Sequence, residues 1–143
     1  MIFESVNLLI ISKNATFFME DETDLQNSIP SKDVSNSKNK HRVSFKMKLH
    51  HGFESEYKKR HDEIWPDLKL LLKSAGISEY SIFLDEETNT LFAFMKVSDQ
   101  QAVDRLPSHP VMKKWWNYMK DIMETNDDNS PVSVPLQEVF YLP

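Results

Sequence analysis

Apolar and polar residues alternate along the chain between positions 43 and 49. The apolar positions are Val43, Phe45, Met47 and Leu49. A period of two is typical of a strand with one buried face, so we expect a strand beginning near Arg42. The following His50, His51 and Gly52 predict a turn.

A helical pattern follows over about residues 53–75. Its apolar and aromatic residues recur at close to helical spacing: Phe53, Tyr57, Ile64, Leu68 and Leu71. Pro66 lies inside this span, so we expect it either to kink the helix or to begin a second segment. Gly76 fits the C-terminal cap.

Two more strands, over 79–84 and 90–97, are separated by a short polar run that predicts a turn. A short turn makes two strands pair antiparallel, so this part of the chain predicts a hairpin. Ser98 is a suitable N-cap for a short helix over 99–105.

The C-terminal part predicts a longer helix over 111–123, a polar loop over 126–135 and a last strand over 136–142. The resulting order is strand, helix, strand, strand, helix, strand. This order predicts an α+β fold of the ferredoxin-like type, an antiparallel sheet with helices on one face.

The strand over 90–97 is apolar on both faces. Leu91, Ala93, Met95 and Val97 alternate with Phe92 and Phe94. Helices on one side would leave the other face as an exposed apolar patch. We therefore expect a homodimer packed sheet to sheet, and the alternative is that the N-terminal segment covers this face.

Residues 1–41 follow no such pattern and are expected to be a flexible extension, whereas 42–143 should form one folded domain. Residues 28–40 are rich in Ser, Asn and Lys, which cannot bury enough surface to offset the entropy lost on ordering. The apolar piece 6–11 is the one candidate strand there. Its apolar core is too short for a secretory signal.

Composition narrows the classes of function. The chain has 143 residues, a net charge of −5 and no cysteine. Its negative charge disfavours nucleic acid as a partner and gives no reason to expect a membrane. Without cysteine there is neither a disulfide nor a thiolate nucleophile, and a cytoplasmic location is favoured. No two histidines have the helical spacing of a metal site, so no metal is expected.

Three side chains on buried faces are candidates for chemistry. Tyr57 and His61 lie four residues apart, and so on one helix face directed at the sheet. Tyr80 shares a strand face with Ile82 and Leu84 and should also point inward. Buried polar groups need partners or a wet cavity, and an imidazole titrates near neutral pH.

Trp115 and Trp116 are adjacent on the second long helix, so their side chains diverge by roughly 100°. We expect one to face the core and the other to face a cleft, a partner or solvent. An indole offers a rigid apolar surface to the C–H face of a sugar ring. With His61 and the tyrosines, this pattern favours proton transfer on an uncharged polar ligand.

Four segments of the chain have distinctive sequences: YKKRHDEIWPDL at 57–68, KKWWNYM at 113–119, NDDNSP at 126–131 and LQEVFYLP at 136–143. Together they resemble the L-rhamnose mutarotase family. The resemblance runs from about Arg42 to Pro143, whereas residues 1–41 depart from the family pattern. It implies a homodimeric ferredoxin-like fold, L-rhamnose as substrate and no cofactor.

The resemblance also implies residue roles. His61 would be the catalytic histidine, and Tyr57, Tyr80, Trp115 and Trp116 would contact the sugar. The reaction would interconvert the α and β anomers of L-rhamnopyranose through ring opening and closing. His61 would act as general acid in opening and as base in closure, and Tyr57 or Tyr80 would orient a hydroxyl or help to relay the other proton.

Other functions remain open at this stage. Monooxygenases and haem-degrading enzymes use the same dimeric fold, and there His61 would bind haem or an aromatic substrate. A non-catalytic sugar-binding module and an epimerase for another 6-deoxy sugar are further alternatives. The residues do not decide whether the loop near Asn129 contacts a ligand.

Overall fold

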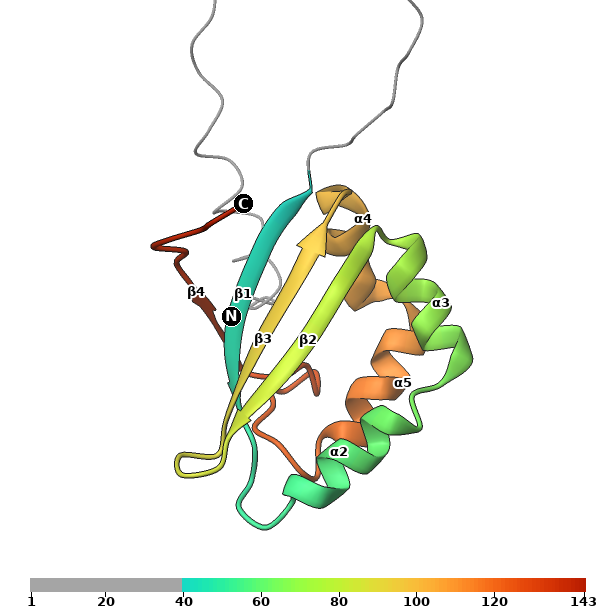
Figure 1. Ribbon diagram of the computed structural model, residues 1–143. Helices are drawn as coiled ribbons and strands as arrows, with labels where there is room; N and C mark the ends of the chain where they lie inside the picture. Colours follow the sequence, from blue (N-terminus) through green and yellow to red (C-terminus); the bar gives the residue numbers. More distant parts are fainter. Residues whose placement is uncertain (1–39) are drawn as a thin grey trace, which may run out of the picture.

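A four-stranded sheet and a layer of helices on one of its faces make up the molecule (Figure 1). The computed structural model describes residues 40–143. The expected extension over 1–41 lies almost wholly outside the described residues, as does the candidate strand at 6–11. The elements are β1 His41–Lys48, α2 Glu54–Asp62, α3 Pro66–Ser74, β2 Ile77–Asp85, β3 Thr90–Val97, α4 Gln100–Arg105, the 3₁₀ turn η1 Leu106–Ser108, α5 Pro110–Met119 and β4 Ser133–Leu136.

The sheet has the strand order β2-β3-β1-β4, and every neighbouring pair is antiparallel. Strand β1 is therefore central, with Phe45 opposite Ala93 of β3 and Pro135 of β4. The order of elements along the chain confirms the α+β, ferredoxin-like expectation. None of the helices that the structure describes has the length and apolar character needed to cross a membrane.

The core lies between the sheet and the helices. Strand β3 places one face there, since Leu91, Ala93 and Val97 are almost fully buried. Helix α3 contributes Leu68 and α5 contributes Met119, which are 1% and 2% exposed. A fully buried leucine or methionine contributes about 1.5–3 kcal/mol of hydrophobic stabilisation, so these contacts fix both helices on the sheet.

Pro66 begins a second helix, which is one of the two outcomes expected for it. Helix α2 ends at Asp62, and Trp65 is extended (φ −61°, ψ 135°) before Pro66 takes the first position of α3. A proline disfavours the helical conformation in the residue before it, which is why the chain cannot continue straight through. The long span at 53–75 is thus two helices with separate axes.

Two predictions about helix ends are wrong. Asp99, and not Ser98, is the N-cap of α4, because its carboxylate accepts a hydrogen bond from Ala102 N–H at 3.0 Å. The Ser98 hydroxyl instead donates to the carbonyl of Gly76 at 3.2 Å. Helix α5 ends at Met119 and does not reach residue 123. The apolar pattern continues past this end since Ile122 is buried in the core.

The last strand is also placed wrongly by the sequence pattern. The prediction puts it at 136–142, but β4 is Ser133–Leu136 and takes the end of the expected loop. It pairs only with residues 44–47 of β1, so the chain after Leu136 has no strand partner in the sheet that the structure describes. Pro135 is tolerated because β4 is an edge strand. The apolar tail beyond it is exposed, with Val139 at 91%.

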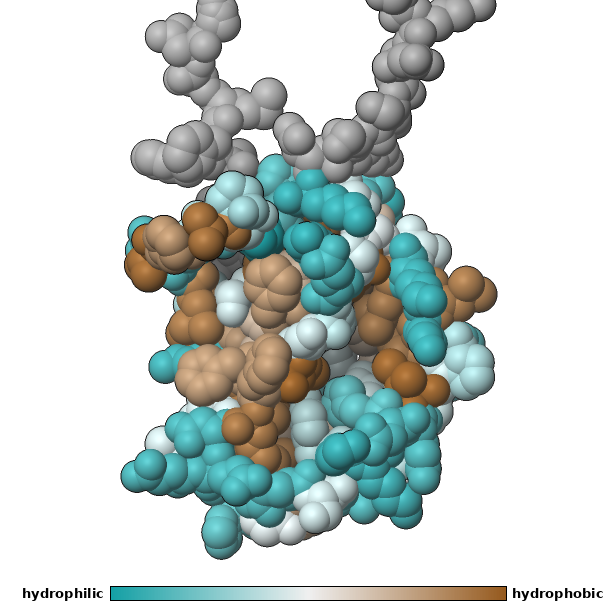
Figure 2. Space-filling view, in the orientation of Figure 1, coloured by the Kyte–Doolittle hydropathy of each residue, from teal (hydrophilic) through white to brown (hydrophobic). Residues whose placement is uncertain are grey.

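The sheet face turned away from the helices is apolar, as predicted. Phe83 lies opposite Phe92 across β2 and β3, and Phe94 follows two residues further along β3. Phe83 is 65% exposed and Phe92 is 38% exposed. Figure 2 shows hydrophobic side chains gathered over the strands. No part of the chain that the structure describes covers these rings.

The two glycines offer a matched test of the junction between α3 and β2. Both have a positive φ, +83° at Gly76 and +89° at Gly52. A Cβ on Gly76 would lie 2.5 Å from the Ser98 hydroxyl and 3.1 Å from the Asp99 nitrogen, whereas Gly52 has nothing within 4 Å. Gly52→Ala should therefore lower the free energy of unfolding only by the strain of a left-handed backbone at alanine, about 1–2 kcal/mol.

Gly76→Ala should lower the free energy of unfolding by about 1–3 kcal/mol more than Gly52→Ala does, because the new methyl group overlaps its neighbours. Urea unfolding of the two variants and the parent measures the difference. Equal losses in the two variants would contradict the tight packing described here.

Candidate active site

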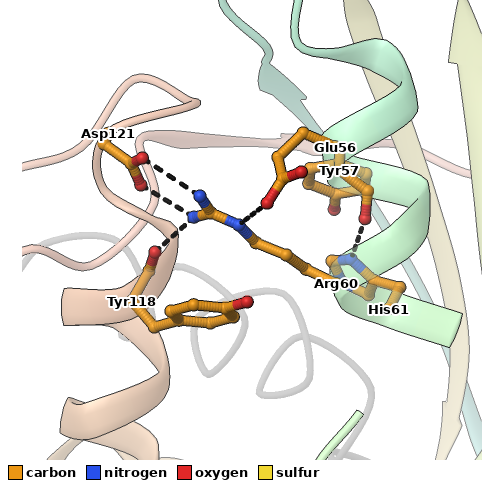
Figure 3. Close-up of polar contacts among 6 residues, drawn as sticks. All are labelled: Glu56, Tyr57, Arg60, His61, Tyr118 and Asp121. Atoms are coloured by element: carbon orange, nitrogen blue, oxygen red, sulfur yellow. Dashed lines mark hydrogen bonds and ion pairs between the residues drawn. The ribbon is translucent and has the colours of Figure 1, made fainter. Parts of the chain in front are cut away.

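Helix α2 carries a stacked pair of rings. The Tyr57 and His61 rings lie 4.3 Å apart with an interplanar angle of 29°. The Nδ1 atom of His61 lies 3.0 Å from the Tyr57 carbonyl oxygen, which can only accept (Figure 3). Nδ1 is therefore protonated and donates, and the neutral ring keeps its lone pair on Nε2. Within residues 40–143, Nε2 has no hydrogen-bond partner.

Helix α5 supplies an aromatic wall beside this pair. Trp115 meets the His61 ring edge-on, with 5.3 Å between ring centroids. Trp65 packs against Trp115 at 5.3 Å, and Tyr118 lies close to both indoles. Such edge-on and tilted contacts are favourable geometries for aromatic pairs, so the cluster fixes the imidazole in place.

A cavity of about 920 Å³ lies between the helices and the inner face of the sheet. All five residues expected at the site line it: Tyr57, His61, Tyr80, Trp115 and Trp116. Much of the remaining wall is apolar, including Leu68 and Met119. A mostly apolar cavity of this size with a few convergent polar groups is typical of a small-molecule site.

Both tryptophans lie in the buried core and line this cavity, so the expected division, with one indole in the core and the other at a cleft, a partner or solvent, is wrong. Trp115 is 8% exposed and Trp116 is 5% exposed. Consecutive side chains on a helix differ by about 100° around its axis. Both can lie in one wide buried stripe when the direction midway between them points at the sheet. Helix α5 therefore presents two indoles to one cavity.

Tyr80 reaches the cavity from β2. The strand has a bulge between Ser78 and Ser81, where Glu79 takes a positive φ of 49°. Tyr80 is 40% exposed as a whole, yet burial raises the pKa of its hydroxyl to about 12. Burial also raises the pKa of Tyr57. Both phenols therefore stay protonated, and able to donate, at neutral pH.

Burial has the opposite effect on the imidazole. Desolvation lowers the pKa of His61 below its usual value, although the hydrogen bond to Tyr57 and the nearby carboxylate of Asp62 act against this change. His61 is consequently neutral at neutral pH. The site then contains a base, the Nε2 lone pair, beside phenol donors.

Charged residues at the rim nearly balance one another. Four carboxylates and three lysines line the cavity: Glu54, Asp62, Glu79, Glu86, Lys58, Lys69 and Lys73. Lys58 pairs with Asp62 at 2.6 Å, and Glu79 pairs with Lys96 at 2.8 Å. The balance suits an uncharged ligand. Among residues 40–143, no group of three or more His, Asp or Glu side chains is placed to hold a metal ion.

Sequence patterns did not indicate three residues that support the site. Tyr118 lies one helical turn after Trp115, and this spacing was a usable signal. Trp65 lies in the break between α2 and α3, where no periodicity can place it. Arg60 lies on α2, but its partner Asp121 is distant in sequence, so no local pattern indicates the pair. The two side chains are joined by two hydrogen bonds (Figure 3).

The fold and cavity define a ferredoxin-like α+β protein with a site suited to acid–base chemistry on an uncharged small molecule. The family model of L-rhamnose mutarotase matches residues 42–142. The chain belongs to this family.

Individual relatives agree with the family match. An L-rhamnose mutarotase from Formosa agariphila is 60% identical over 101 residues, covering 71% of this chain and 97% of the relative. One from Brucella anthropi is 57% identical and covers 71% and 96%. A crystal structure of an L-rhamnose mutarotase from Formosa agariphila matches with a TM-score of 0.68 at 59% identity, covering 72% of this chain and 99% of that one. The comparisons do not support a monooxygenase or a haem-degrading enzyme.

The protonation state of His61 can be tested directly. We expect ¹⁵N NMR to find the Nδ1–H tautomer and a pKa below about 6.5, the value of an unperturbed histidine. Because the pKa is lower in the folded state, unfolded chains bind a proton first as the pH falls. His61 thus contributes stability above about pH 6.5 that is lost as the pH falls through its folded pKa.

Urea unfolding across this pH range gives a second measurement. The variant His61→Gln should show a smaller loss of stability toward acid pH than the parent. An Nε2–H tautomer would contradict the hydrogen-bond assignment, and a His61 pKa above that of a free peptide would contradict the dominance of burial over that hydrogen bond.

Proposed function

We propose that the chain catalyses the interconversion of the α and β anomers of L-rhamnopyranose, with His61 as the acid–base residue. The proposal rests chiefly on one observation, the unpartnered Nε2 of a neutral imidazole inside an aromatic-lined cavity of a family member. General acid–base assistance typically contributes about 10²–10⁴-fold in rate.

The state of His61 favours an order of proton transfers different from the one first expected. In the neutral ring, Nε2 accepts the proton of the anomeric hydroxyl while the bond between C1 and the ring oxygen breaks. A phenol, Tyr57 or Tyr80, gives a proton to the ring oxygen. The result is the open aldehyde, an imidazolium at His61 and a phenolate that is short-lived because burial disfavours it.

Ring closure reverses these transfers after rotation about the C1–C2 bond. The hydroxyl that was formed from the ring oxygen attacks the other face of the aldehyde and returns its proton to the phenolate. The imidazolium returns its proton to the new anomeric oxygen, so His61 acts as base in opening and as acid in closure. No electrons are exchanged and no group leaves, so the proposed reaction needs no cofactor. Trp115 and Trp116 hold the apolar face of the ring meanwhile.

The test is anomer exchange of L-rhamnose, followed by saturation-transfer NMR. His61→Ala should lose about 10²–10⁴-fold in rate because it removes the proton acceptor. His51→Ala is the matched control, since the His51 side chain is 92% exposed and does not line the cavity. A folded His61→Ala protein with the activity of the parent would rule out the assignment of His61.

We also propose that the protein is a homodimer joined through the outer sheet face. Phe83, Phe92 and Phe94 form a contiguous aromatic patch that the described chain leaves open. Exposed apolar patches of this kind are typical of interaction sites. A second copy of the same sheet is the simplest cover, because a two-fold axis lets one patch bury itself against its twin.

Phe83→Glu should convert the dimer to a monomer, because it would place unpaired carboxylates in the apolar interface. Leu70→Glu is the matched control. Leu70 is 69% exposed, close to the 65% of Phe83, but it lies on α3 in the helix layer. Sedimentation equilibrium measures the mass of each variant. A monomeric parent, or a Phe83→Glu protein that remains dimeric, would contradict the interface.

A further inference from the structure

The helix that carries His61 has unusually little apolar attachment to the rest of the molecule. Its sequence, ESEYKKRHD, contains no aliphatic residue, and Tyr57 is its one buried side chain. Helix α3, in contrast, presents Leu68, Leu71 and Leu72 to the core. Most helices in proteins are stabilised by packing an apolar face, so α2 needs another means of attachment.

Arg60 supplies a connection from α2 to the end of α5. Its guanidinium donates to both carboxylate oxygens of Asp121, at 2.7 and 3.1 Å, and to the carbonyl of Tyr118 (Figure 3). Its Nε donates to Glu56 at 2.8 Å, and its carbon centre lies 4.4 Å from the centroid of the Tyr118 ring. The side chain is only 11% exposed. Every guanidinium nitrogen is thus used.

This contact also completes the end of α5. The Tyr118 carbonyl is one of the last carbonyls of the helix, which have no partner within it. A cation at this position satisfies the carbonyl and interacts favourably with the helix dipole. The hydrogen bonds from Arg60 lower the pKa of Asp121, so the pair stays charged at neutral pH. Planar two-point pairing makes the link directional as well as attractive.

The Arg60–Asp121 pair lies next to the contact between His61 and Trp115. Arg60 precedes His61 on α2, and its partner Tyr118 follows Trp115 by three residues on α5. The two helices therefore touch at two neighbouring points, His61 with Trp115 and Arg60 with Tyr118 and Asp121. Movement of α2 away from α5 would break both at once.

We infer that the Arg60–Asp121 ion pair is a positioning clamp that holds the imidazole of His61 against the Trp115 wall of the cavity. The catalytic consequence rests on the proposed mutarotase function. Arg60 and Asp121 do not line the cavity, so they act through His61 and not on the sugar. Misplacement of a catalytic group by about 1 Å can cost about 10²-fold in rate, which sets the upper size of the effect.

The test uses three substitutions in the full chain. Asp121→Asn keeps the shape of the side chain but removes its charge, and folding should survive because Asp121 is 60% exposed. Asp121→Glu keeps the charge and should restore most of the activity. Glu138→Gln is the matched control, because Arg42 and Glu138 form a similar two-point pair and neither residue lines the cavity.

Two readouts separate positioning from simple stability. In Asp121→Asn we expect kcat for L-rhamnose exchange to fall by about 10-fold to 10²-fold, with a smaller change in KM because both indoles still bind the ring. The ring-proton NMR signals of His61 should shift because the imidazole leaves the Trp115 ring, whereas the Nδ1–H tautomer, which is fixed within α2, should not change. Glu138→Gln should change neither kcat nor the His61 signals.

An Asp121→Asn protein that loses stability but keeps the parent kcat and the parent His61 signals would overturn the clamp. Failure of the proposed function looks different, since the parent itself would not accelerate anomer exchange. In that case the His61 signals alone still decide the clamp. Unchanged signals in Asp121→Asn would reject it whatever the reaction is.

Discussion

The Nδ1–H of His61 donates to a backbone carbonyl one turn earlier on the same helix, at 3.0 Å. This hydrogen bond fixes both the tautomer and the direction of the ring, because the acceptor belongs to the rigid backbone of α2. The position of the reactive Nε2 atom in the cavity therefore depends on the position of α2. The cavity wall, the stacking on Tyr57 and the contact with Trp115 all depend on that placement.

Burial separates the proton affinities of the groups in the cavity. It disfavours whichever form is charged, so it lowers the pKa of His61 and raises those of Tyr57 and Tyr80. The same apolar wall thus yields a neutral base and neutral acids side by side. Reversible proton exchange in both directions needs both kinds of group, and here one environment provides them.

The sequence predicts the order of elements and the inward-facing residues because both depend on local periodicity. Alternation placed β3 correctly, and helical spacing brought Tyr57 and His61 to one face. Periodicity fails where the backbone stops being regular. It extended α5 through the buried Ile122, and it missed Trp65 in the break before Pro66. Contacts between distant segments, such as Arg60 with Asp121, leave no local signal.

The break at residues 63–65 divides a single stretch of chain into two helices of different character. Helix α3 is apolar and anchored in the core, whereas α2 is polar and attached by a few specific side chains. Surface residues of α2 that face neither Asp121 nor the rings, such as Lys59, can therefore vary without a large loss of stability. Protein engineering can therefore rebuild the outward-facing positions of this nine-residue segment while Tyr57, Arg60 and His61 are kept.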